Sequence, residues 1–243
     1  MADILDFESE IKRLIEAEQK ICRLVDEVYI DERGLASPIY DGVIVPALYL
    51  KAPKRILWIL KEPWDGVNSS GGEWSLSKCL AEKPVSELSQ STFHPIIYIT
   101  YGIFKNVAEY NKMPRVKDMD NPEDLLRSIA FINVKKLPGV TRGAYSPTIM
   151  SWYGKGREII KRQLEAYQPD IVFGCSPHFP SIMEGLIPEL KKAIKTSGSA
   201  DYASSGSRIY VHVHHPGQTQ NGRAKYVDDA LAAVLSAQSD QPR

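Results

Sequence analysis

The chain has 243 residues, of which 43% are hydrophobic and 25% charged, and its 30 Lys and Arg residues balance its 30 Asp and Glu residues. This composition is that of an ordinary globular protein, so it excludes a disordered or fibrous chain and disfavours a protein that coats nucleic acid through its net charge. No stretch approaches the ~20 apolar residues of a membrane span, and the acidic N-terminus lacks the basic start of a signal peptide. We therefore expect a cytoplasmic protein with no membrane partner.

The sequence of the first half of the chain predicts three helices and one buried strand. An amphipathic helix is expected from Phe7 to about Val28, within residues 1–30, because apolar residues recur there at helical spacing. VIVPALYL (43–50) can form an extended segment, and Arg55–Leu60 is predicted to be a central strand because its apolar run is continuous. Residues ~96–110 and ~122–129 are expected to be helical.

The second half alternates strands and helices. The expected elements are a strand at Ser128–Val134, a long loop, a helix at ~155–167, a strand at Pro169–Cys175, a helix at ~180–195, a strand at Arg208–Val213, a helix at ~223–236 and a frayed tail at 237–243. This alternation predicts an α/β fold. We expect a single domain over residues 1–243, a three-layer sandwich whose mostly parallel sheet of four to five strands carries helices on both faces.

Polar residues follow each predicted strand of this sheet. KEPWDG (61–66) follows the first strand, Asn133 ends the second, SPH (176–178) follows the third and HHPGQ (214–218) follows the fourth. Ligands of open α/β sheets bind outside the carboxyl ends of the strands. A carboxylate, an amide and a histidine are therefore expected to meet at one edge of the sheet.

At these positions the sequence resembles the uracil-DNA glycosylase superfamily, over roughly residues 55–235. LKEPWDG stands where one branch has GQDPYH, FINVKKL where it has LNTVL, VFGCSPH at a Gly-Ser-His-like turn and HHPGQ at a His-Pro-Ser-Pro-type loop, while YGIFKNVAEY resembles a helix that follows a phosphate-contacting turn. The chain departs from that pattern at Glu62 in place of Asp, at Trp64 and Asp65 in place of Tyr-His, and at Gly217 and Gln218 in place of Ser-Pro.

The resemblance implies a DNA glycosylase, a hydrolase of N-glycosyl bonds that removes a flipped-out uracil or related damaged base in base excision DNA repair. Such cleavage builds positive charge on the sugar and negative charge on the departing base. Glu62 would stabilise the sugar and position water, and His215, or His214 in its place, would donate a hydrogen bond to the base. Asn133 would accept from uracil N3–H and donate to O4. The candidates for an aromatic wall beside the flipped base are Trp64, Phe93 and Trp74.

The expected partner is DNA, single- or double-stranded, bound by a monomer. Residues 132–162 hold seven basic residues against one acidic residue, which allows a local basic face. The candidate contacts to the DNA backbone are Lys135, Lys136, Arg142, Gly217 and Gln218.

No cofactor and no metal are expected. The three cysteines, Cys22, Cys79 and Cys175, are too few and too dispersed for the iron–sulfur cluster of some branches of the superfamily. Two alternatives remain open: the HVHH run (212–215) could bind a metal, and the whole chain could be a nucleic-acid or nucleotide binding module of the same fold without glycosylase chemistry.

Overall fold

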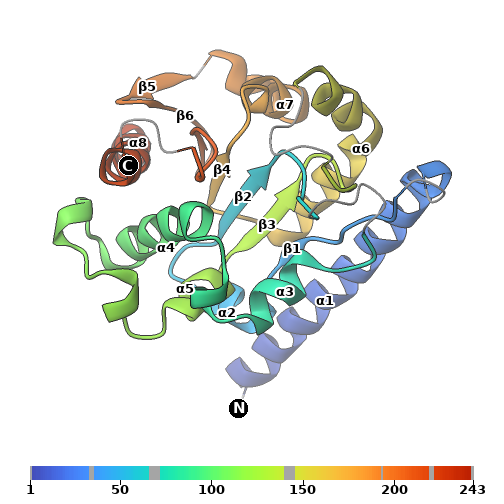
Figure 1. The fold of residues 1–243 in the computed structure, drawn as a ribbon, viewed down its shortest axis with the longest axis horizontal. Helices are drawn as coiled ribbons and strands as arrows, with labels where there is room; N and C mark the ends of the chain where they lie inside the picture. The colour runs from blue at the N-terminus through green and yellow to red at the C-terminus, as the bar shows by residue number, and fades with distance from the viewer. Residues whose placement is uncertain are drawn as a thin grey trace.

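A computed structural model describes residues 2–32, 36–65, 72–139, 146–192, 194–218 and 222–241 of the chain. These residues form a sheet of seven strands with helices packed on both of its faces (Figure 1). The α/β class predicted from the alternation of strands and helices is confirmed.

The sheet is mixed, and its centre is parallel. Its strands lie in the order β1 (Gly42–Val43), β3 (Ala130–Asn133), β2 (Ile56–Leu60), β4 (Ile171–Gly174), β7 (Arg208–His212), β6 (Ala200–Ser205) and β5 (Lys195–Ser197). The four predicted strands are the parallel strands β3, β2, β4 and β7, whereas β1, β5 and β6 pair antiparallel. The prediction of four to five strands is corrected to seven, because the additional strands are short or polar and carry no long apolar run.

Burial on both faces explains the continuous apolar run of β2. Ile56, Trp58 and Leu60 belong to one hydrophobic cluster, and Leu57 and Ile59 belong to the cluster on the opposite face. All five side chains are buried. A strand covered on both sides has no solvated face, so its sequence does not alternate with polar residues.

Each face of the sheet has its own set of helices. One cluster includes residues of α3 (Leu76–Glu82), α4 (Gln90–Lys105), α5 (Pro122–Arg127) and α8 (Arg223–Asp240). The other includes residues of α1 (Ala2–Val28), α2 (Pro46–Lys51), α6 (Ser146–Tyr167) and α7 (Phe179–Leu186). Single 3-10 turns lie at Ile30–Glu32, Val85–Glu87, Tyr110–Lys112, Val116–Asp118 and Pro188–Lys192. No helix within the described ranges is long and apolar enough to cross a membrane.

Several predicted boundaries are corrected by the structure. VIVPALYL is a short strand followed by α2, because Pro46 suits the first turn of a helix. The helix expected at ~180–195 ends at Leu186, before Pro188, and the chain then enters β5. The expected frayed tail is helical as far as Asp240, since Ala237 is fully buried in the core. The helices expected at ~96–110 and ~155–167 begin earlier, at Gln90 and Ser146.

Candidate functional site

The order of the parallel strands defines a topological switch point at their carboxyl ends. β2 lies between β3, which follows it along the chain, and β4, which comes after β3. The connections from β2 and β3 therefore leave in opposite directions, and the carboxyl ends of β2 and β4 flank the point where ligands bind in open α/β sheets. Backbone hydrogen bonds continue past the strands, from Cys175 N to Ile59 O at 3.0 Å and from Val213 N to Gly174 O at 3.0 Å.

Glu62 lies directly beyond β2 and is held by an ion pair. Its Oε2 accepts a hydrogen bond from Lys135 Nζ at 2.9 Å, and each side chain is only 11% exposed. The Lys135 ammonium also donates to Pro138 O at 3.0 Å and lies 5.9 Å from the ring centre of Trp152. Lys135, predicted to contact DNA phosphates, has the Glu62 carboxylate as its partner in this structure.

A glycine makes room for the Glu62 carboxylate. Gly139 N donates to Pro63 O at 2.8 Å, which holds the segments that follow β2 and β3 side by side. A Cβ atom on Gly139 would come 2.7 Å from Glu62 Oε1. The carboxylate is therefore packed against backbone on one side and against Lys135 on the other, which fixes its orientation.

His215 follows β7 at the same edge, and its ring is held in one tautomer. Gly217 N donates to His215 Nδ1 at 3.1 Å, so the proton of the neutral ring is assigned to Nε2. Burial lowers the pKa of His215, and the nearby positive charge of Lys61 lowers it further. A neutral ring with an Nε2–H donor is the form that the predicted role requires.

The loop that carries His215 is anchored to α8 and lies close to α4. Tyr226 of α8 donates from its hydroxyl to His214 O at 2.8 Å. A Cβ atom on Gly217 would lie 3.2 Å from Thr92 Oγ1 of α4, so the loop closely approaches the start of that helix. Gly217 and Gln218 are exposed at the tip. Their predicted contact with the DNA backbone stays a prediction.

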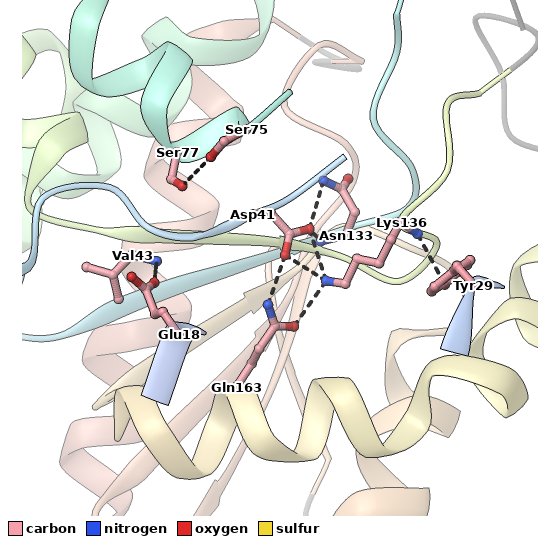
Figure 2. Close-up of polar contacts among 9 residues, drawn as sticks. All are labelled: Glu18, Tyr29, Asp41, Val43, Ser75, Ser77, Asn133, Lys136 and Gln163. Carbon is pink, nitrogen blue, oxygen red and sulfur yellow. Dashed lines mark hydrogen bonds and ion pairs between the residues drawn. The ribbon is translucent and has the colours of Figure 1, made fainter. Parts of the chain in front are cut away.

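Asn133 ends β3 with its side chain only 1% exposed. Asp41 Oδ2 accepts from the backbone N of Asn133 at 2.7 Å and from its Nδ2 at 3.4 Å. The other amide atom, Oδ1, is buried and has no hydrogen-bond partner among the described residues. Figure 2 shows the amide nitrogen turned toward Asp41 and the oxygen turned away from it.

Lys136 is buried and cannot contact DNA from this position. Its side chain is 1% exposed, and its Nζ donates to Asp41 Oδ1 at 2.7 Å, to Asp41 Oδ2 at 3.0 Å and to Gln163 Oε1 at 3.0 Å (Figure 2). Burial lowers the pKa of Lys136, while the Asp41 carboxylate opposes that shift. The prediction that Lys136 binds the DNA backbone is therefore wrong. Arg142, predicted for the same role, lies outside the described residues.

The aromatic candidates differ in exposure. Trp64 is 53% exposed beside the segment that carries Gly139, with which it forms a β-bridge. Phe93 instead is partly buried and packs edge-on against Phe131 of β3, with ring centres 6.0 Å apart, so its ring lies against the hydrophobic core. The indole Nε1 of Trp74 is buried without a hydrogen-bond partner among the described residues.

Some features of the structure were not expected from the sequence. Asp41 and Gln163, which hold Lys136, are far from it along the chain, and no motif marks them. An apolar hollow lies between α7 and the strands β6 and β7, away from Glu62, and is lined by Phe179, Met183, Leu190, Tyr202, Tyr210 and His212. In the HVHH run, His212 lies 3.4 Å from Asp201, and the described residues contain no group of three potential metal ligands.

Comparison with known proteins does not place the chain in a family. No protein-family model matches it, and no curated protein matches it either.

Proposed function

We propose that this protein is a DNA glycosylase that hydrolyses the N-glycosidic bond of a flipped-out uracil or a related damaged base. The observation that carries this proposal is the state of His215. Its lowered pKa favours the neutral ring, Gly217 N–H occupies Nδ1, and Nε2–H remains as a donor at the carboxyl edge of the sheet. Such a donor stabilises negative charge as it develops on a departing base.

The reaction assigned to the site is a hydrolysis. The bond between C1′ and the base nitrogen breaks, and its electron pair leaves with the base, whose oxygen accepts a hydrogen bond from His215 Nε2–H. The oxygen of a water molecule then bonds to C1′, and Glu62 accepts a proton from that water. The base anion takes up a proton from solvent, and Glu62 returns its proton to solvent. These transfers complete the products, an abasic sugar and a free base, and restore the carboxylate. The Lys135 ion pair and Gly139 hold the Glu62 carboxylate in a single orientation for this task.

Base binding is assigned to residues at the same edge of the sheet. Asn133 carries a buried oxygen that has no donor among the residues that the structure describes, and a base placed against it supplies one. Trp64 is exposed at the same edge and offers a surface on which a base stacks. The exposed backbone of Gly217 and Gln218 is available to the DNA strand.

A second candidate function is a nucleotide or nucleic-acid binding module without glycosylase chemistry. The observation in its favour is the ion pair of Glu62, because Lys135 already neutralises the carboxylate that the hydrolysis requires. This candidate retains the contacts of Asn133 and Trp64 but not the reaction.

One assay separates the two functions. Oligonucleotides that carry uracil, hypoxanthine, xanthine or a modified pyrimidine, each single- and double-stranded, are incubated with excess protein and scored for alkali-labile abasic sites. The proposal predicts strand breaks at uracil or a related base and none at thymine in the same position. Binding of these oligonucleotides without an abasic site in any of them contradicts the glycosylase and supports the binding module.

A further inference from the structure

The amide of Asn133 is locked in one orientation. Asp41 Oδ2 accepts from both the backbone N and the side-chain Nδ2 of Asn133. A flip of the amide would place Oδ1 against the Asp41 carboxylate, where two oxygens with no hydrogen between them repel each other. The nitrogen is therefore fixed on the side of Asp41, and the oxygen faces the opposite way (Figure 2).

Asp41 is itself held by two buried partners. Lys136 Nζ bonds both of its oxygens, and Gln163 Nε2 donates to its Oδ1 at 2.9 Å. The side chains of all three residues are 1% exposed or less. Burying an ion pair costs desolvation energy that its attraction often does not recover, so such a pair is weak evidence of stabilisation. The ion pair instead holds the Asp41 carboxylate, whose oxygens only accept hydrogen bonds, in a fixed position beside Asn133.

The orientation leaves one hydrogen bond unmade. Asn133 Oδ1 is buried and has no donor among the described residues. A buried polar atom without a partner costs about 1–3 kcal/mol, and such atoms are rare in folded proteins. A ligand that brings an N–H to this oxygen removes that cost. A ligand that brings a ring nitrogen without a hydrogen does not remove that cost, because two hydrogen-bond acceptors then face each other.

We propose that Asp41 is a positioning residue which, with Lys136 and Gln163, holds Asn133 as an acceptor, so that the site takes a base with a ring N–H beside a carbonyl. This inference rests on the proposed function, because it assumes that Asn133 faces a base. The remaining Nδ2 hydrogen serves the carbonyl. Uracil presents that edge, whereas cytosine presents the reverse pattern, which only a flipped amide would match.

The test removes the charged pair without leaving a lone charge. Asp41→Leu/Lys136→Met keeps the side chains close in size, and the exposed pair Lys195 and Asp240, 2.9 Å apart, provides the matched control Lys195→Met/Asp240→Leu. Equilibrium binding of free uracil, N3-methyluracil and cytosine is followed by NMR titration of all three proteins. Circular dichroism verifies that each is folded.

Wild type and the control are expected to bind uracil about tenfold or more tightly than either other probe, since the wrong edge leaves buried polar atoms unpaired. In Asp41→Leu/Lys136→Met the preference for uracil over cytosine should fall at least about threefold, because the amide can then flip. An unchanged preference in the folded variant overturns the proposal.

If the double variant does not fold, the binding of the three probes to the wild type still tests whether Asn133 is a fixed acceptor. Equal binding of uracil and N3-methyluracil, or no binding of any probe, contradicts a fixed acceptor. These outcomes are separate from failure of the glycosylase, because the probes contain no glycosidic bond. A protein that prefers free uracil but produces no abasic site retains the Asp41 inference and loses the proposed hydrolysis.

Discussion

Glu62 and His215, both at the carboxyl edge of the sheet, have different electrostatic surroundings. Glu62 forms an ion pair with Lys135, whereas burial and the positive charge of Lys61 lower the pKa of His215 and so favour its neutral form. Lys61 forms no ion pair within the part of the chain that the structure describes. Among the described residues, the edge therefore combines a fixed carboxylate, an uncharged donor and the unpaired cation Lys61, an arrangement suited to the proposed reaction, in which an anion departs.

Replacing His215 by alanine tests whether its ring donates the hydrogen bond to the departing base. His215→Ala should lower the single-turnover rate of base removal about 10²–10³-fold, the usual cost of losing one preorganised donor to a developing anion. DNA affinity and thermal stability should change little, because the ring makes its one described hydrogen bond to Gly217 of its own loop.

His214→Ala is the matched control for that experiment, since His214 is exposed and its anchoring contact to Tyr226 uses the backbone oxygen. This variant should keep the wild-type rate. An inactive His214→Ala together with a normal His215→Ala would show that the adjacent histidine is the donor.

Among the helices and strands, α1 is joined to β1 through a partly buried carboxylate. Glu18 of α1 accepts from Val43 N at 2.8 Å, and burial raises its pKa from 4.5 to about 7 although that hydrogen bond lowers it. The nearby Asp41 charge adds to the increase. Between these two pKa values the folded protein binds more protons than the unfolded chain, so this group makes folding less favourable as the pH rises from 4.5 to 7, and the loss persists above 7.

Glu18→Gln removes that dependence while it keeps an oxygen for Val43 N. The variant should be more stable than wild type by about 1–2 kcal/mol at pH 8, and the difference should vanish near pH 4.5, as measured by urea denaturation at both pH values. Glu16→Gln, at an exposed position of the same helix, should show no such difference. If the wild type is at least as stable as Glu18→Gln at pH 8, the conclusion that the ionised Glu18 carboxylate makes folding less favourable is contradicted.

The sequence predicts those elements whose residues obey a local rule. The parallel strands are recognisable because burial on both faces demands apolar runs such as that of Ile56–Leu60. β5 escapes prediction because its residues are exposed and polar at the edge of the sheet. The ion pairs of Lys135 and Lys136 could not be predicted either. Glu62 is 73 residues from Lys135, and Asp41 is 95 residues from Lys136, so only the folded chain brings these partners together.

In the molecule as a whole, four of the seven basic residues of 132–162 form ion pairs with carboxylates. Lys135 and Lys136 are paired with carboxylates inside the site, and on α6 Lys161 and Arg162 are paired with Glu165. The net charge of the chain is zero. The proposed recognition of DNA therefore relies on local contacts at the carboxyl edge more than on long-range attraction to phosphates.

The proposed hydrolysis depends on Glu62, and the substitution Glu62→Gln is its most direct test. The measurement is the single-turnover rate of abasic-site formation on a uracil-containing oligonucleotide, with Glu87→Gln, an exposed surface change, as the control. Gln keeps the shape of the side chain and removes its charge, so substrate affinity should stay within about threefold while the rate falls at least about 10²-fold. A Glu62→Gln variant that forms abasic sites at the wild-type rate would contradict the assignment of Glu62 to the hydrolysis.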